Sequence, residues 1–369
     1  MVGMSLFPEN FPEIAEVSSP ALLFYPDRIQ RNIDRMIAIA GDPGHLRPHI
    51  KTHKSAEVIR MQMECGIDRF KCATLAEAEL LGKEYADDVL LAMQPVGPHI
   101  QSYIEIAKVF PESSYSVLLD NSAVIGQVNA ACAESSMRLG AFLDLNVGMN
   151  RTGVEPGLEA MARYKQLHEA SYLDVKGLHV YDGHIKNADV CELEHSVNEA
   201  YDQVENFMLQ LEKLGFAPPV VVAGGSPTFP IHAKRDGVEL SPGTTLIWDY
   251  NYSRHFPEME FENAAFLVSR VISKPTYGVV CFDLGHKAVA SEMPHPRIHF
   301  QGIEDIEYIG HSEEHLVAKV GNWESIQVGG TYLGIPSHIC PTVSLYDHVN
   351  VIEGQRVVGT WKNAARHRL

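Results

Sequence analysis

The sequence lacks the features that are typical of membrane-spanning and nucleic-acid-binding proteins. Its purely apolar runs, such as Val220–Ala223, are far shorter than the roughly 20 residues that cross a bilayer. Positive charge is scarce, because 30 Lys and Arg stand against 47 Asp and Glu and leave a net charge of −17. Nucleic acids and anionic membranes both attract a positive face. We therefore expect neither of them as a partner.

Cysteine is also scarce, and its spacing argues against a disulfide framework. Six cysteines are scattered through 369 residues, and none of them forms a C-x-x-C pair. The first 20 residues carry Glu9, Glu13 and Glu16 without a basic stretch, so they do not resemble a secretory signal. We expect reduced thiols and a cytoplasmic location.

No G-x-G-x-x-G motif follows an early strand, so the main signature of a dinucleotide-binding open sheet is missing. Up to about residue 262, short β-branched runs alternate with helical patterns, which indicates βαβ units and a parallel sheet. About eight strands over roughly 230 residues favour a TIM-like (βα)8 barrel over a doubly wound sheet, which remains possible. The expected strands are 21–25, 46–51, 69–73, 89–94, 115–120, 138–146, 175–181, 219–223 and 239–247. The expected helices are 56–65, 75–85, 100–110, 123–135, 158–170 and 193–214.

After residue 262 the pattern changes to short β-rich segments that Gly, Pro, Asn and Asp separate, which is typical of an antiparallel β domain. The expected strands there are 266–273, 278–283, 307–309, 315–319, 325–328, 331–334, 349–353 and 355–361. We therefore expect a barrel over 21–262, a β domain over 263–369 and an N-terminal segment over 1–20 that packs with the β domain.

A basic segment, Arg47-Pro-His-Ile-Lys51-Thr-His-Lys54, ends an early strand. The carboxyl ends of barrel strands meet at the mouth, where the active sites of such barrels lie. A lysine crowded by other cations at that position can form a Schiff base. The segment by itself is also typical of a solvated surface loop.

Two glycine-bearing segments follow late strands of the expected barrel. Gly224-Gly225-Ser226 and Ser241-Pro-Gly243-Thr244 can offer backbone N–H groups and hydroxyls to a phosphate dianion. Loops after the last two strands are the usual phosphate position in such barrels.

Two other strand ends carry polar groups of catalytic types. Asp144–Gly153 presents Arg151 from a glycine-rich turn, where its guanidinium can bind a phenolate or a carboxylate. Gly177–His184 ends with Tyr181, an aromatic ring, and with His184, an imidazole that can act as an acid or a base. Packing of His179 beside Tyr181 and simple exposure of His184 are the plainer alternatives.

One motif in the β-rich part has a metal-ligand spacing. His338 and Cys340 are two residues apart, so on a strand they would point to the same face and could share a cation. Zinc accepts imidazole and thiolate together. The pair alone is weak support, because cysteines outside disulfides are mostly buried apolar residues.

These motifs together resemble those of the fold-type III pyridoxal-phosphate enzymes, the alanine-racemase-like class, and within it the D-threonine aldolase and D-serine dehydratase branch. The resemblance covers essentially the whole chain. It implies that Lys51 carries the cofactor pyridoxal 5'-phosphate and that a divalent metal, zinc or manganese or magnesium, binds His338 and Cys340. It also implies further cofactor contacts from His49, Arg151, Tyr181, Gly224, Gly225, Ser226, Gly243 and Thr244.

The activity that the resemblance implies is a lyase reaction on a D-β-hydroxy-α-amino acid, in the first place that of D-threonine aldolase. Asn187 stands where the aldolase branch has a catalytic histidine, which makes His184 the substitute acid–base candidate. Cys340 resembles the dehydratase branch, so a D-serine or D-3-hydroxy amino acid dehydratase is the alternative. An amino-acid racemase, a non-catalytic cofactor-binding protein and a cofactor-free barrel are further alternatives. The resemblance also implies a homodimer.

Overall fold

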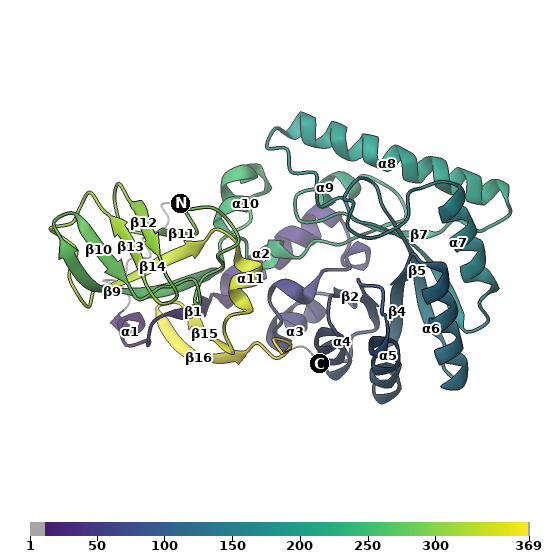
Figure 1. Cartoon of the computed structure of the whole chain (residues 1–369), viewed down its shortest axis with the longest axis horizontal. Coiled ribbons are helices and arrows are strands. Elements are labelled where there is room, and N and C mark those ends of the chain that lie inside the picture. The colour runs from purple at the N-terminus through teal and green to yellow at the C-terminus, as the bar shows by residue number, and fades with distance from the viewer. Residues whose placement is uncertain (1–11, 368–369) are drawn as a thin grey trace. The chain divides into compact units, whose positions relative to one another are not determined.

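A computed structural model describes residues 12–367, so residues 1–11 of the expected N-terminal segment lie outside the described residues. The chain divides into two compact units, each built from segments that are distant in the sequence (Figure 1). Within the described residues, the barrel unit comprises 36–51, 58–243 and 367. The sheet unit comprises 12–35, 52–57 and 244–366.

The barrel unit contains a parallel sheet of seven strands that follow one another in chain order. Two isolated parallel bridges, Leu46 to Leu240 and His49 to Lys71, join the last strand to the first through the segment 46–49. The expected (βα)8 barrel is thereby confirmed, with one of its strands reduced to these two bridges. The strands are β2 (Arg69–Cys72), β3 (Asp88–Leu91), β4 (Ser114–Leu119), β5 (Leu139–Leu145), β6 (Leu173–Val180), β7 (Val220–Ala223) and β8 (Val238–Leu240).

Helices alternate with these strands and lie on the outer face of the sheet, as Figure 1 shows for α4 to α7. They are α3 (Ala56–Glu64), α4 (Leu75–Lys83), α5 (Pro98–Val109), α6 (Ser122–Glu134), α7 (Leu158–Glu169) and α8 (Val190–Lys213). Each of the six expected helices is present. The helical pattern of α2 (Pro26–Ala40), with Ile29, Ile33 and Met36 fully buried, was absent from the expected set. No helix of the described chain is long and apolar enough to cross a membrane.

Inward-facing side chains fill the barrel in layers. Near the amino-terminal ends of the strands, the buried Arg47 guanidinium binds Asp88 and Glu239, each at 2.6 Å. Arg69 also binds Glu239, at 2.8 Å. Above this charged layer lies an apolar cluster of Leu90, Leu118, Phe142 and Val222. The polar groups described below occupy the carboxyl ends of the strands.

The sheet unit is a nine-stranded, mainly antiparallel sheet, which confirms the expected second architecture. Ala21–Phe24, expected among the barrel strands, pairs instead with two strands of this sheet. Residues 325–328 do not form the expected strand, and Ile298–Phe300 is a strand that the sequence pattern did not indicate. The strands are β1 (Ala21–Phe24), β9 (Ala265–Thr276), β10 (Val279–Phe282), β11 (Ile298–Phe300), β12 (Glu307–His311), β13 (Leu316–Lys319), β14 (Thr331–Pro336), β15 (His348–Glu353) and β16 (Arg356–Lys362).

The short helix α1 (Pro12–Ala15) precedes this sheet and packs on it. Its residue Ile14 is fully buried in a cluster with Phe266, Val268 and Leu333 of the sheet. Three further short α-helices are present: α9 (Phe229–His232) in the barrel unit, and α10 (Tyr250–His255) and α11 (Ile339–Val343) in the sheet unit.

Gly177 provides a direct test of the barrel's strand packing. A Cβ atom at this position would lie 1.9 Å from the carbonyl oxygen of Val220 on the neighbouring strand, so the two backbones would have to separate. We expect Gly177→Ala to lower the free energy of unfolding by about 2 kcal/mol or more. Gly126→Ala is the matched control, because this exposed position in α6 has open space and an ordinary helical backbone. It should raise the stability by about 0.5–1 kcal/mol, and equal effects of the two substitutions in urea unfolding would contradict the packing.

Candidate active site

Lys51 lies where the bridging segment of the barrel ends. It belongs to the 3-10 helix η3 (Ile50–Thr52), and its backbone N–H donates to Nδ1 of His49 at 3.3 Å. The His49 N–H donates to the Pro242 carbonyl at 2.8 Å, beyond the end of β8. Backbone bonds to the neighbouring strands therefore place Lys51 and His49 at the carboxyl end of the barrel, as the sequence predicts.

The two glycine-bearing loops that follow β7 and β8 are joined to each other. The Gly243 N–H donates to the Ser226 hydroxyl at 3.3 Å. Gly224 has a φ of +83°, which a side chain would strain. At the start of the second loop, the hydroxyl of Ser241 is buried and has no hydrogen-bond partner among the described residues. A buried hydroxyl that lacks a partner costs free energy, so the loops have the composition and the unmet hydrogen bond of a phosphate site.

A buried network behind the first loop fixes its shape. Asp182 accepts a hydrogen bond from the Thr228 hydroxyl and another from Nε2 of His232, both at 2.8 Å. The Thr228 hydroxyl in turn accepts from the Gly225 N–H at 2.9 Å. Asp182, Thr228 and His232 are all at most 2% exposed. None of these three residues is among the predicted site residues, although Asp182 lies directly beside Tyr181.

Tyr181 links several of the predicted cofactor residues. The guanidinium carbon of Arg151 lies 4.9 Å from the centre of the tyrosine ring, in a cation–π arrangement. A Cβ atom at Gly225 would lie 3.4 Å from the ring, and one at Gly183 would lie 2.3 Å from it. The ring is thus closely flanked by glycine backbone and capped by a cation.

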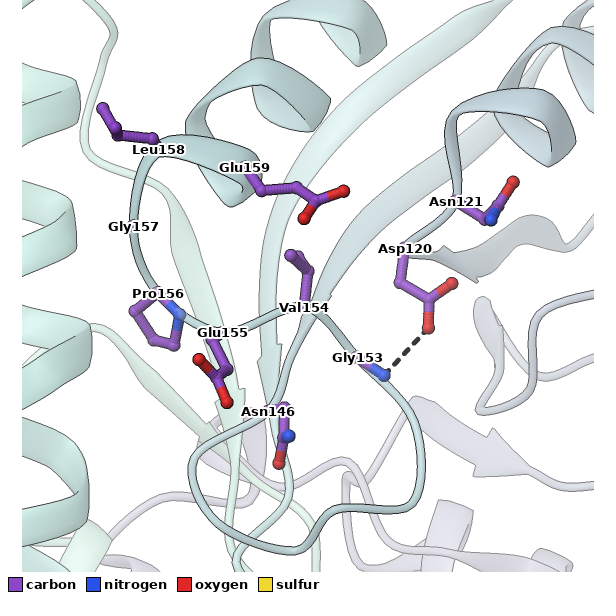
Figure 2. A pocket seen from close by; sticks show the side chains of 10 residues that line it. All are labelled: Asp120, Asn121, Asn146, Gly153, Val154, Glu155, Pro156, Gly157, Leu158 and Glu159. Carbon is purple, nitrogen blue, oxygen red and sulfur yellow. Dashed lines mark hydrogen bonds between the residues drawn. The ribbon is translucent and has the colours of Figure 1, made fainter.

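The loop that carries Arg151 is anchored by an acidic neighbour. The Gly153 N–H donates to the Asp120 carboxylate at 2.8 Å, which Figure 2 shows. Together with Asn146, Glu155 and Glu159, this carboxylate lines a cavity of about 580 Å³. Its carboxylates disfavour an anionic ligand, so this cavity supports the loop and is not a candidate for the phosphate site.

His184, the predicted acid–base group, is exposed. Its imidazole lies against the same glycine-rich loop, because a Cβ atom at Gly148 would come within 2.8 Å of His184 Nε2. The imidazole is therefore accessible to a ligand at the carboxyl end of the barrel strands.

A second lysine, which is not among the predicted site residues, lies among these groups. Lys71 on β2 is 2% exposed, and its Nζ is 3.4 Å from Nε2 of His179. Nδ1 of His179 is 2.6 Å from the Asp144 carboxylate. Burial, followed by the charge of Lys51, lowers the pKa of Lys71 to about 7, and burial likewise lowers the pKa of His179. One signal in the sequence could have indicated Lys71. Arg69 and Lys71 are two residues apart on a strand, so both side chains point to the same face.

The predicted metal pair lies in the sheet unit, with a local geometry different from the expected one. His338 is the extended residue before α11, whereas Cys340 is already in the helix, so the two do not occupy a strand. Their side chains nevertheless lie close enough for Cys340 to raise the pKa of His338. The expected strand geometry was therefore wrong, and metal binding by this pair stays a prediction.

Anionic and polar groups surround this pair. Glu292 accepts a hydrogen bond from Nδ1 of His338. The hydroxyls of Thr52 and Thr244 each lie 3.4 Å from the Cys340 sulfur. Burial lowers the pKa of the His338 imidazole. The neighbouring groups of Cys340, Glu292 and Asp249 outweigh this effect and raise that pKa to about 9. Imidazole and thiolate match the chemistry of zinc. No group of three or more His, Cys, Asp or Glu within residues 12–367 has the geometry of a metal site.

A closed parallel barrel with a lysine at its carboxyl end, followed in sequence by a mainly antiparallel sheet, defines the alanine-racemase-like class of proteins. The chain belongs to the family described as "Alanine racemase, N-terminal domain", whose model matches residues 25–250. A second model, "Putative serine dehydratase domain", matches residues 264–352.

Comparison with known proteins gives similarity over nearly the whole length. The chain is 27% identical to a D-threonine aldolase of Arthrobacter sp, covering 99% of this chain and 97% of that one. It is 28% identical to a 3-hydroxy-D-aspartate aldolase of Paracoccus denitrificans, covering 95% and 93%. The crystal structure of D-threonine aldolase from Filomicrobium marinum has a TM-score of 0.86 at 26% identity and covers 95% and 96%.

This family implies the cofactor pyridoxal phosphate, and the barrel residues suit it. The joined glycine loops with the unpaired Ser241 hydroxyl suit the phosphate, and the aromatic and cationic groups around Tyr181 suit a ring that bears an anionic oxygen. The lysine that would bind the cofactor covalently lies at the same end of the barrel.

The network behind the glycine loop generates a prediction. Asp182→Asn replaces a carboxylate that accepts from both Thr228 and His232, so one of these hydrogen bonds is weakened or lost. We expect a loss of about 1–3 kcal/mol in stability and a cofactor dissociation constant roughly tenfold higher, measured by absorbance titration of the apoprotein. Asp236→Asn is a control on an exposed residue of the same unit and should change neither quantity. Unaltered cofactor binding in Asp182→Asn would show that the network does not shape the phosphate loop.

Proposed function

We propose that the protein is a pyridoxal-phosphate- and divalent-metal-dependent lyase that cleaves D-β-hydroxy-α-amino acids into glycine and an aldehyde, with D-threonine as the reference substrate. The observation that carries the proposal is the full-length similarity to two aldolases that are named for D-amino-acid substrates. The arrangement of Lys51, Tyr181 and the glycine loops at one end of the barrel supports it.

In this proposal the barrel residues bind and orient the cofactor. Lys51 provides the amine for the covalent link, beside His49. Arg151 and Tyr181 hold the ring and its anionic oxygen. The backbone and hydroxyl groups of the two glycine-bearing loops hold the phosphate, and they belong to Gly224, Gly225, Ser226, Gly243 and Thr244. When it is bound, the cofactor supplies an electron sink for the carbon adjacent to the amine.

Cleavage between Cα and Cβ requires a group that removes the proton of the β-hydroxyl. His184 is the proposed acid–base group, because its imidazole is accessible beside the Arg151 loop. Its side chain would hold the hydroxyl proton as the aldehyde leaves. Asn187, in the position of the branch's histidine, is an amide and has no basic nitrogen for this task.

His338 and Cys340 are the proposed metal ligands. An imidazole and a thiolate suit zinc, and the acidic groups near His338 favour a cation. A metal held there would act as a Lewis acid on the substrate hydroxyl. Thr52 and Thr244, which lie beside the Cys340 sulfur, directly follow Lys51 and Gly243 in the chain.

The first test is a product assay. We expect chelator-treated protein, reloaded with pyridoxal phosphate and with Zn²⁺ or Mn²⁺ in separate samples, to convert D-threonine to glycine and acetaldehyde. Omission of the metal should abolish the turnover, and L-threonine is the stereochemical control. Formation of 2-oxobutanoate and ammonia would contradict the aldolase assignment and establish a dehydratase.

Two substitutions separate the proposed roles. Lys51→Ala should abolish the visible absorbance band of the lysine-bound cofactor, whereas His338→Ala should retain that band and lower the turnover about 100-fold or more. Lys108→Ala and His348→Ala are controls on exposed residues of the same types. Full activity of His338→Ala would exclude His338 as a metal ligand. An intact absorbance band in Lys51→Ala would exclude Lys51 as the residue that binds the cofactor covalently.

We also propose that the protein is a cytoplasmic homodimer. Symmetric dimers are the commonest oligomers of soluble proteins, and the scattered cysteines agree with a reducing compartment. Light scattering of the holoenzyme should give about twice the 40.9 kDa mass of the chain. A fully active monomer would contradict this assembly.

A further inference from the structure

The buried lysine of β2 belongs to a chain of three hydrogen-bonded side chains. Nζ of Lys71, the imidazole of His179 and the carboxylate of Asp144 follow one another at 3.4 and 2.6 Å. Each of the three residues is at most 4% exposed. None of the three has a role in the proposed binding of the phosphate or of the metal.

The geometry of this chain limits its protonation. The carboxylate of Asp144 can only accept, so Nδ1 of His179 carries a hydrogen and donates it. Nε2 of His179 and Nζ of Lys71 are then two basic nitrogens in contact. A hydrogen bond between them requires that one of the two be unprotonated. Beyond the hydrogens of their neutral forms, Lys71 and His179 can therefore hold one additional proton between them at most.

While no anion is bound, the groups around Lys71 disfavour its protonated, cationic form. The basic groups Lys51 and Arg151 act on Lys71, against the carboxylates Asp144 and Asp182. Both carboxylates already accept hydrogen bonds, from His179 and from Thr228 and His232. Burial is the largest influence, and it lowers the pKa of Lys71 to about 7. The charged and titratable groups that face Lys71 are Lys51, His49, Asp144, Arg151, His179, Tyr181 and Asp182.

The position of Lys71 relates it to the cofactor residues. Its Nζ lies 5.6 Å from the centre of the Tyr181 ring, to which Arg151 also makes a cation–π contact. Its backbone pairs with that of His49, two residues before Lys51. An anionic ligand at this position would interact favourably with Lys51, Lys71 and Arg151.

We propose that Lys71 is an anion-binding residue of this site, and that at mildly alkaline pH it gains its proton only when the anionic cofactor enters. This inference rests on the proposed cofactor site. The proton comes from solvent and is held by Lys71 and His179 while the ligand remains bound. The residue would therefore be uncharged in the apoprotein at mildly alkaline pH and cationic in the complex.

The proposal predicts proton uptake that is coupled to cofactor binding. Pyridoxal phosphate is titrated calorimetrically into the full-length apoprotein at pH 8, in two phosphate-free buffers with different ionisation enthalpies. The buffer dependence of the heat gives the number of protons that are taken up. We expect the wild type to take up about half to one proton more than Lys71→Met, because the ligand's charge raises the pKa of a nearby amine. Lys71→Met should also bind the cofactor about tenfold more weakly.

Two variants provide the controls. Lys71→Arg carries a permanent cation, so it should retain cofactor binding and lose the additional proton uptake. Lys108→Met changes an exposed lysine of the same unit and should behave as the wild type does. A merely structural role of Lys71 would lower the stability of both Lys71 variants without separating binding from proton uptake.

A measurement on the wild type alone keeps the proposal testable where a variant fails to fold. Below about pH 6 Lys71 would already be protonated in the apoprotein, so the additional uptake should vanish there and be largest between about pH 7.5 and 9. Uptake that is the same from pH 6 to 9, or the same in wild type and Lys71→Met, would overturn the proposal. Absence of any cofactor binding by the wild type would instead overturn the proposed function.

Discussion

The candidate site depends on the closure of the barrel through residues 46–49. Two backbone bridges and the buried ion pairs of Arg47 hold this segment between β8 and β2. Breaking such a buried pair by removing one partner costs about 3–5 kcal/mol, so the segment is strongly fixed. Because Lys51 follows it within two residues, the same bonds that close the ring determine where the reactive amine lies.

The layered interior explains how one barrel can be both stable and reactive. Charged pairs occupy one end, an apolar cluster the middle and titratable groups the other end. The apolar layer lies between the two polar layers. Arg47 and Glu239 form an ion pair within their own layer. The polar layer at the carboxyl end contains basic groups in excess, as expected for a site that binds an anionic ligand.

The sequence predicted the elements well where a local pattern determines them. All six expected helices are present, since a helical stripe of apolar residues is a local signal. The glycine loops, Arg151 and Tyr181 were selected because such residues after strands of a barrel meet at one end, and the structure brings Tyr181 close to both Arg151 and Gly225. Their roles in binding remain predictions.

Features that depend on pairing between distant segments could not be predicted. The strand Ala21–Phe24 is a short apolar run that would suit either sheet, and only its partners β9 and β15 assign it to the second one. The expected strand 46–51 contains Pro48, which cannot donate to a ladder, and it keeps only two bridges. The partnership of Lys71 with His179 joins residues 108 positions apart, which no local spacing reveals.

The division into two units has a spectroscopic consequence. All three tryptophans, Trp248, Trp323 and Trp361, belong to the sheet unit, and the barrel unit contains none. Intrinsic tryptophan emission therefore reports on the sheet unit alone, whereas the visible absorbance of a chromophore held at Lys51 would report on the barrel. Two wavelengths are enough to show whether the two units of this interleaved chain melt together or in sequence.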